Sequence, residues 1–206
     1  MNHSELIRNA TQTLIDHADE LTALDQAIGD GDHGINMRRG ALAIQARQDE
    51  LAAMSLNDAL RTMGLTCMSK IGGSAGPVFG TLLLTLATEL PDPPTAAALA
   101  SAVNAGIKAL TRLGKAEVGQ KTLLDVLDPV EKTLARGGDD LLARVRQCAF
   151  DSSDATAQMD AIKGRASFLG DRALGHVDPG SRSVALVIAA ICDSLHQTNR
   201  TSLPSA

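Results

Sequence analysis

Apolar residues recur at three- and four-residue steps along most of the chain, and this spacing places them on one face of a helix. The first periodic stretch runs from about Ser4 to Leu24, and Ser4 fits an N-cap. Further helices are expected over about 35–52, 56–69, 77–90, 95–113, 122–136, from 139 to near 151–154, and over 181–196. No stretch alternates apolar and polar residues as a half-buried strand does. The pattern therefore predicts an all-α fold of about eight antiparallel helices.

Several connections between the expected helices have an unusual composition. They are the acidic turn D-Q-A-I-G-D-G-D-H-G-I-N at 25–36, the glycine-rich turn I-G-G-S-A-G at 71–76, the loop L-G-K-A-E-V-G-Q-K at 113–121, and G-H-V-D-P-G at 175–180. In an up-and-down bundle, alternate connections lie at the same end. Counting from the first helix predicts that these connections share one end of the molecule. No internal linker divides the chain, so we expect a single domain over 1–206.

Composition narrows the class of protein. Hydrophobic residues make up 44% of the chain, but it has no Trp or Tyr and only three Phe, so the core must be aliphatic. A net charge of −5 without a basic cluster argues against nucleic-acid binding. Cys67, Cys148 and Cys192 are odd in number and widely spaced, which fits reduced thiols. The N-terminus does not resemble a signal peptide and no apolar run is long enough to span a membrane, so we expect a cytoplasmic protein without membrane contact.

The acidic turn carries the strongest chemical signal. Asp25, Asp30 and Asp32 place three carboxylates within eight residues, and such close acids are stable together at neutral pH only beside positive charge. Hard oxygen ligands of this kind suit Mg²⁺ or Ca²⁺ better than Zn²⁺. An ordinary turn would explain one Asp-Gly pair but not this combination, and the loop lacks the ligand pattern of an EF-hand. The turn therefore predicts a hard-cation site whose remaining ligands are water or phosphate oxygens.

The glycine-rich turn and an arginine offer complementary groups. Amides exposed at 71–76 before a helix start suit phosphate oxygens, although the same turn also fits a simple helix–helix connection. The phosphate-binding loop of P-loop NTPases and the dinucleotide fingerprint are both absent. Arg165, in G-R-A-S-F-L-G, would stabilise transferring phosphoryl charge if it lay near a metal–phosphate site. His33 beside Asp32 fits a ligand contact, and Thr122 fits an N-cap in the capping-box-like T-L-L-D.

Taken together in this order, the motifs of the chain resemble those of the L subunit of dihydroxyacetone kinase. They are D-x-x-x-x-G-D-G-D-H-G-x-N, G-G-S-A-G-P-x-F-G, G-Q-K-T-L-L-D and G-R-A-S-F-L-G-x-R-x-x-G-H-x-D-P-G, and they extend over nearly the whole chain. The resemblance implies a barrel of about eight antiparallel helices with a nucleotide at one end. The chain departs from the family pattern at Gln120, where Asp is common, and at Leu123, where Met is common.

The same resemblance implies roles for individual residues. Asp25, Asp30 and Asp32 would hold a pair of Mg²⁺ ions that bridge the phosphates of ADP or ATP. Arg165 would be the catalytic residue and would close over the nucleotide. The remaining nucleotide contacts would come from His33, Gly34, Ile35, Asn36, Ser74, Ala75, Gly114, Thr122, Leu123, Asp178, Pro179 and Gly180.

The resemblance also implies that the substrate is held elsewhere. In this family a separate K subunit or fused domain holds dihydroxyacetone through a histidine, and a phosphohistidine-bearing M subunit of the phosphotransferase system recharges bound ADP. We therefore expect a phosphotransferase subunit that does not phosphorylate the ketose by itself. One alternative is an ATP-exchanging kinase for another short ketose such as erythrulose. Others are an ADP-dependent partner of a transcriptional regulator and a cation-binding helical bundle without catalysis.

Overall fold

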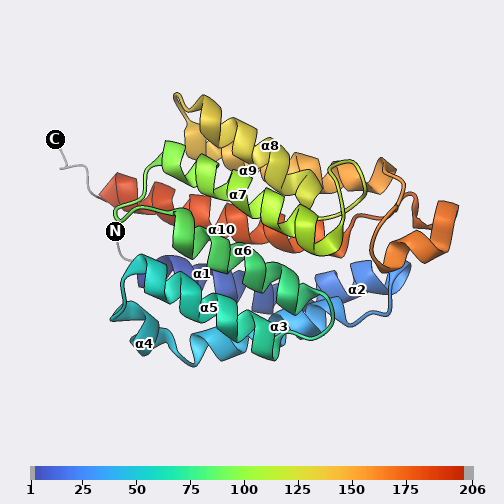
Figure 1. The fold of residues 1–206 in the computed structure, drawn as a ribbon, viewed down its shortest axis with the longest axis horizontal. Helices are drawn as coiled ribbons and strands as arrows, with labels where there is room; N and C mark the ends of the chain where they lie inside the picture. Colours follow the sequence, from blue (N-terminus) through green and yellow to red (C-terminus); the bar gives the residue numbers. More distant parts are fainter. Residues whose placement is uncertain (1–2, 202–206) are drawn as a thin grey trace.

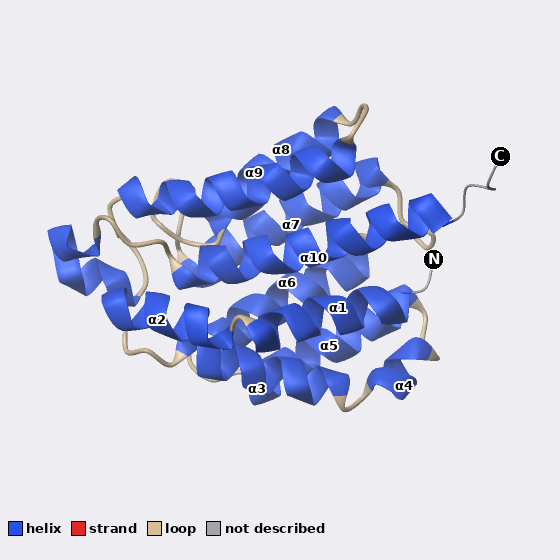
Figure 2. Cartoon of the chain, turned by 180° about the vertical axis from the view of Figure 1, so that it is seen from behind, coloured by secondary structure: helices blue, strands red, loops and turns tan. Residues whose placement is uncertain are grey.

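The computed structural model describes residues 3–201, and the regular structure within that range is entirely helical (Figure 2). The predicted all-α class is therefore confirmed. The N-terminal half holds α1 (His3–Asp16), α2 (Ala18–Ile28), α3 (His33–Gln45), α4 (Gln48–Ala52), α5 (Leu56–Lys70) and α6 (Ala75–Glu89). The C-terminal half holds α7 (Ala96–Gly114), α8 (Leu124–Arg136), α9 (Leu141–Ala155), the 3₁₀ segments η1 (Thr156–Gln158) and η2 (Arg165–Ala173), and α10 (Pro179–Thr201).

The long helices form a closed ring. Following the chain, α5 packs against α6, α6 against α7, α7 against α8, α8 against α9 and α9 against α10. The ring closes because α10 packs against α1, α1 against α3 and α3 against α5. Their axes run along the length of the molecule, with both termini at one end and α2 and η2 at the other (Figure 1). The result is an antiparallel helical barrel in which alternate connections share an end.

Aliphatic side chains fill most of the barrel. One cluster of buried residues contains side chains from α6 through α10. A second contains side chains from α1 through α5 and from α10. Between them lies an apolar cavity of about 320 Å³. Cys67 and Cys192 line this cavity as free thiols, and burial raises their pKa values to about 12 and about 11. These two thiols therefore stay protonated at neutral pH and pack as small apolar groups.

The first predicted helix is divided in the structure. The stretch expected over 4–24 breaks at His17, whose Nδ1–H donates to the Thr13 carbonyl at 2.9 Å, and α2 begins at Ala18. Ser4 lies inside α1, which begins at His3, so its prediction as an N-cap is wrong. The break redirects α2 toward the end of the barrel that holds the acidic turn (Figure 1).

The helix expected over 35–52 is also divided, into α3 and α4. The Gln48 side chain donates to the carbonyl and the hydroxyl of Ser4, at 2.7 and 2.6 Å, and Leu51 is buried. These contacts to α1 draw α4 out of line with α3. Every residue between Gln45 and Gln48 is an ordinary helix former, so the break has no local signal in the sequence.

The predicted capping box forms in part, just before α8, which begins at Leu124 with Leu123 as its N-cap. The Asp125 carboxylate accepts from the Thr122 backbone N–H at 2.7 Å, and the Thr122 hydroxyl accepts from the Leu124 N–H at 3.3 Å. The last helix begins two residues earlier than expected, at Pro179, because Asp178 accepts from the Ser181 N–H at 2.6 Å and so caps it. Both caps belong to loops at the same end of the barrel.

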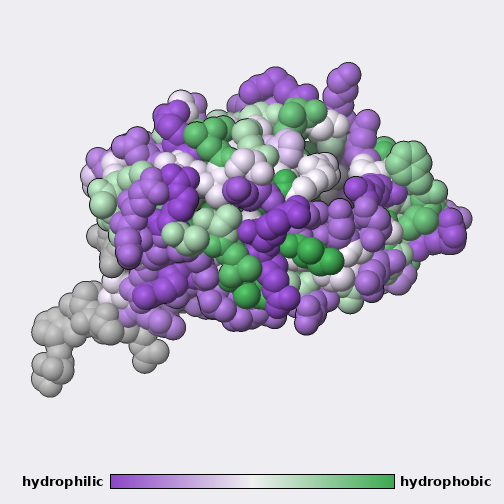
Figure 3. Space-filling view, turned by 90° about the horizontal axis from the view of Figure 1, so that it is seen from below, coloured by the Kyte–Doolittle hydropathy of each residue, from purple (hydrophilic) through white to green (hydrophobic). Residues whose placement is uncertain are grey.

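The surface is mostly hydrophilic on the side that carries α3 and α4, with small hydrophobic groups between charged side chains (Figure 3). The exposed apolar residues of α3 and α5 include Ile35, Leu42 and Leu65. Among the described helices, none is both long and apolar enough to cross a membrane.

Candidate functional site

A cavity of about 360 Å³ opens at the end of the barrel that holds α2 and η2. It receives residues from the acidic turn, the glycine-rich turn, the loop before α8 and the D-P-G loop, as the alternation of connections predicted. The predicted site residues that line it are Asp25, Asp30, Asp32, His33, Asn36, Ser74, Ala75, Gly114, Thr122, Leu123, Arg165, Asp178, Pro179 and Gly180. Its volume lies in the range of pockets that hold small ligands.

The three carboxylates of the acidic turn converge at one side of this cavity. Asp25 lies in the last turn of α2 and is buried, Asp30 is exposed, and Asp32 precedes α3. One oxygen from each lies within 4.8 Å of the others. The backbone N–H of His33, at the start of α3, donates to Asp25 at 3.1 Å, and the positive end of that helix dipole favours negative charge there. The donor set is all oxygen and anionic, which fits Mg²⁺ with water or phosphate as further ligands.

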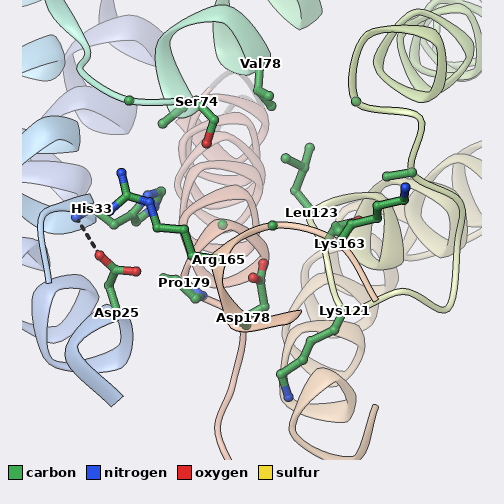
Figure 4. A pocket seen from close by; sticks show the side chains of 18 of the residues that line it. Asp25, His33, Ser74, Val78, Lys121, Leu123, Lys163, Arg165, Asp178 and Pro179 are labelled. Carbon is green, nitrogen blue, oxygen red and sulfur yellow. Dashed lines mark hydrogen bonds between the residues drawn. The ribbon is translucent and has the colours of Figure 1, made fainter. Parts of the chain in front are cut away.

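Arg165 reaches the same carboxylates from η2. Its guanidinium forms an ion pair with Asp30, and Figure 4 shows the side chain extending across the cavity toward His33 and Ser74. The G-R-A-S-F-L-G motif therefore brings its arginine beside the acids, as predicted. A cation bound by the acids would compete with Arg165 for Asp30 and leave the guanidinium available to an anionic ligand.

His33 joins two of the loops. Its Nε2–H donates to the Ser183 hydroxyl at 2.6 Å, and that hydroxyl donates in turn to the Pro179 carbonyl at 2.6 Å. Burial lowers the pKa of His33, while Asp25 and the Pro179 carbonyl act in the opposite direction. A neutral imidazole with its proton on Nε2 therefore holds the start of α3 against the D-P-G loop.

Helix starts and apolar side chains complete the walls. Ser74 precedes α6 without a side-chain cap, which leaves the first amides of α6 for a ligand. On the side of the cavity away from Asp25, Val78 and Leu123 contribute apolar side chains to the wall (Figure 4). The cavity thus has a charged part suited to phosphates and an apolar part suited to a flat ring.

Lys121 is a lining residue that sequence reasoning did not single out. It is almost fully buried, and its ammonium donates to the carbonyls of Thr156 and Met159 at 2.7 and 3.4 Å. Burial lowers its pKa, while Asp178 and Asp160 act to raise it. The only available signal was its place inside G-Q-K-T-L-L-D, because its partners are backbone atoms distant in the sequence.

Comparison with known proteins identifies the family. Residues 27–193 match the model of the DAK2 domain. The chain belongs to the DAK2 domain family. It is 40% identical over 172 residues to the PEP-dependent dihydroxyacetone kinase 1, ADP-binding subunit DhaL, of Listeria innocua, covering 83% of this chain and 84% of that subunit. It is 36% identical to the corresponding Escherichia coli subunit, covering 82% of this chain and 84% of that subunit.

Larger proteins contain the same DAK2 domain. Human triokinase/FMN cyclase is 32% identical over 92% of this chain, which corresponds to 34% of that protein. The native dihydroxyacetone kinase of C. freundii has the same fold, with a TM-score of 0.77 and 24% identity over 93% of this chain and 34% of that one. The predicted resemblance to the L subunit and the phosphotransferase class are thereby confirmed.

Two residues expected to contact the nucleotide, Gly34 and Ile35, are not among the residues that line this cavity of the DAK2 domain. The Ile35 side chain is 60% exposed. Gly34 lies where α3 meets α2, and a Cβ there would be 1.9 Å from the Ala18 carbonyl oxygen and 2.6 Å from the Thr22 nitrogen. Close helix packing therefore requires glycine at this position of the motif.

Gly34→Ala is expected to destabilise the DAK2 domain by about 2 kcal/mol or more, because the added methyl group must push α2 and α3 apart. The neighbouring Ile35→Ala is the matched control and should change stability by less than about 0.5 kcal/mol, because that side chain is largely exposed. Chemical denaturation of both variants measures the difference. Equal stability of the two variants would contradict the packing role.

Asp178→Asn is expected to stabilise the ligand-free protein above pH 6. Loss of water contact raises the pKa of Asp178 to about 6, from an ordinary value of 3.8, and Asp125 adds to the effect while Ser181 and Lys121 oppose it. The folded state therefore binds more protons than the unfolded state between these values, and stability falls as pH rises through that window. Asparagine can still accept from the Ser181 N–H but does not titrate.

Thermal unfolding of wild type and Asp178→Asn from pH 4 to pH 8 measures this effect. The variant should be more stable by roughly 1–3 kcal/mol at pH 7.5, and the difference should shrink as pH falls toward 4. A difference that does not change with pH would show that Asp178 is ionised without cost in the folded protein.

Proposed function

We propose that this chain is the ADP-binding, phosphoryl-transferring subunit of a dihydroxyacetone kinase. One observation carries the proposal: three carboxylates, Arg165 and the uncapped start of α6 line the same cavity. The cavity also has an apolar part. Phosphoryl transfer depends on positioning and on neutralising charge on oxygens, and these groups supply both. The names of the L-subunit relatives support ADP as the nucleotide. Residues 1–206 would act as one domain.

In this proposal Asp25, Asp30 and Asp32 hold a pair of Mg²⁺ ions that bridge the nucleotide phosphates. A pair of cations would offset much of the negative charge of the three carboxylates and the phosphates together. The amides of the 72–75 turn face the phosphates, and the base lies between Val78 and Leu123. A distantly related kinase with this fold has been solved with AMP-PNP and Mg²⁺, which supports the same class of ligand. Arg165 would stabilise the phosphoryl group during transfer.

Other proteins would hold the phosphoryl acceptor and supply the phosphoryl group. The second cavity, inside the barrel, is lined almost entirely by apolar side chains and does not suit a ketose. We propose that dihydroxyacetone is held by a K subunit and that bound ADP is recharged by a phosphohistidine-bearing M subunit in the cytoplasm. Four L-subunit relatives, PEP- or PTS-dependent by name, match this chain over 84–86% of their own length. Two erythrulose kinases match over only 33–34% of theirs, so the comparison supports a separate L subunit over an erythrulose kinase.

Native mass spectrometry of the purified chain tests the ligand assignment. The expected spectrum shows one ADP and two Mg²⁺ retained per chain, and chelation with EDTA should release both. A chain that keeps neither after incubation with Mg²⁺ and ADP would contradict the proposal.

Exchange and turnover distinguish the enzymatic alternatives. Radiolabelled ADP should remain bound through gel filtration, and the 206-residue chain should transfer no phosphate from ATP to dihydroxyacetone unless a K subunit is added. Rapid exchange with ATP would instead favour an ATP-dependent kinase, and turnover by the chain alone would contradict the need for a K subunit.

A further inference from the structure

Arg39, which no motif assigned to the site, does not line the cavity itself but contacts the lining residue Asn36. It lies on α3 one turn after Asn36, and its guanidinium donates to the Asn36 side-chain oxygen at 2.6 Å. Its Nε donates to the carbonyl of Lys70, at the end of α5, at 2.7 Å. The arginine therefore joins α3 to the point where the glycine-rich turn begins.

The contact decides which way the Asn36 amide faces. Arginine has only donors, so the atom of Asn36 that faces it must be the oxygen. The amide nitrogen is then the atom turned to the other side. Asn36 is only 6% exposed and lines the cavity, and within the described residues its amide nitrogen has no hydrogen-bond partner. The amide nitrogen lacks a partner there and yet is not enclosed, so it is open to solvent or to a ligand. Because Asn36 lines the cavity and its oxygen is bonded to Arg39, the amide N–H groups are the part of this side chain left for a ligand.

The glycine-rich turn is shaped around the same pair. A Cβ on Gly72 would lie 2.7 Å from an Arg39 guanidinium nitrogen and 2.7 Å from the Asn36 oxygen. The backbone of the turn therefore rests directly on the hydrogen bond between the two side chains. Movement of the guanidinium would disturb both the Asn36 amide and the amides of the turn.

We propose that Arg39 is a positioning residue that orients the Asn36 amide as a donor to phosphate oxygens of the bound nucleotide. The proposal rests on the function proposed above. A neutral amide so oriented donates to a charged acceptor without adding charge of its own, and such bonds are about twice as strong as neutral ones. With the opposite orientation, the Asn36 oxygen would face the phosphates and repel them.

A double-mutant cycle tests this role. Dissociation constants for Mg²⁺–ADP and for adenosine are measured for wild type, Arg39→Met, Asn36→Ala and the double variant. Arg39→Met should weaken ADP binding roughly tenfold or more and leave adenosine binding within about twofold. In the Asn36→Ala background, Arg39→Met should cost little further affinity, because Arg39 acts through Asn36.

Arg38→Met is the matched control, because Arg38 is an exposed arginine on the same helix and does not line the cavity. It should leave both affinities unchanged. Arg39→Lys keeps a charged donor group and should recover part of the ADP affinity. If Arg39→Met folds poorly, the affinity of Arg39→Lys tests the proposal in its place. Equal losses for ADP and adenosine, or the full cost of Arg39→Met in the Asn36→Ala background, would overturn the proposal. If wild type itself binds no ADP, the proposed function fails instead.

Discussion

Asp30→Asn is expected to weaken Mg²⁺-dependent ADP binding by on the order of a hundredfold or more, with the fold intact. Asp30 belongs to the group of three carboxylates whose oxygens lie within 4.8 Å of one another. Asparagine keeps the size of the side chain but removes one negative charge from the site that would hold the cations. Because the side chain of Asp30 is 44% exposed, its replacement creates no buried cavity. Calorimetric titration with ADP, with and without Mg²⁺, measures the loss.

Asp19→Asn is the matched control for that variant. It makes the same change in charge on an exposed position of α2, away from the cavity lining. It should leave ADP affinity unchanged. Asp30→Asn with wild-type ADP affinity and phosphoryl transfer would show that the metal assignment is wrong. If Asp30→Asn loses nucleotide but still binds a transcriptional regulator, the interaction role and the catalytic role are separate.

Arg165→Gln is expected to slow phosphoryl transfer roughly a thousandfold while changing ADP affinity much less. Arginines that face a transferring phosphoryl group act mainly on the transition state, where charge on the equatorial oxygens is greatest. In this structure the guanidinium pairs with Asp30. Cations held by the acids would neutralise Asp30, and the guanidinium would then be free to face the phosphates.

Single-turnover transfer from the ATP-loaded chain to dihydroxyacetone on a K subunit measures the chemical step. Arg172→Gln, which removes an exposed arginine of η2, is the control and should transfer at the wild-type rate. An Arg165→Gln variant that loses affinity and rate in equal proportion would indicate a role in binding the ground state. An unchanged rate would remove Arg165 from the catalytic group.

Much of the candidate site could be predicted from the order of the motifs along the chain. The acidic turn, the 71–76 turn, the loop before α8 and the D-P-G loop each lay between periodic helical stretches, and the alternation of an antiparallel bundle placed them together. Asp25 and Arg165 are 140 residues apart in sequence, yet both line one cavity. A local contact was also predicted in part, since the Asp125 carboxylate accepts from the Thr122 N–H just before α8.

Other features could not be read in this way because their causes are long-range. The break after Gln45 interrupts a stretch of good helix formers, because the Gln48 side chain bonds to Ser4 of α1. Motif position predicted a ligand contact for Gly34, and nothing in the motif indicated that the backbone of α2 lies directly beside it. Lys121 and Arg39 are unremarkable in sequence, and each makes its contacts to atoms or residues brought near only by folding.

The pattern along the chain was therefore sufficient for the helical class, the aliphatic core and the shared end of the special turns, while the cation site at the three acids stays a prediction. These properties depend on local periodicity, composition and the parity of an antiparallel bundle. Tertiary structure alone decided the orientation of groups within the site, such as the neutral His33 bonded to Ser183 and the Asn36 amide turned by Arg39. Orientation depends on which donors and acceptors meet across helices, and that pairing exists only once the ring of helices has closed.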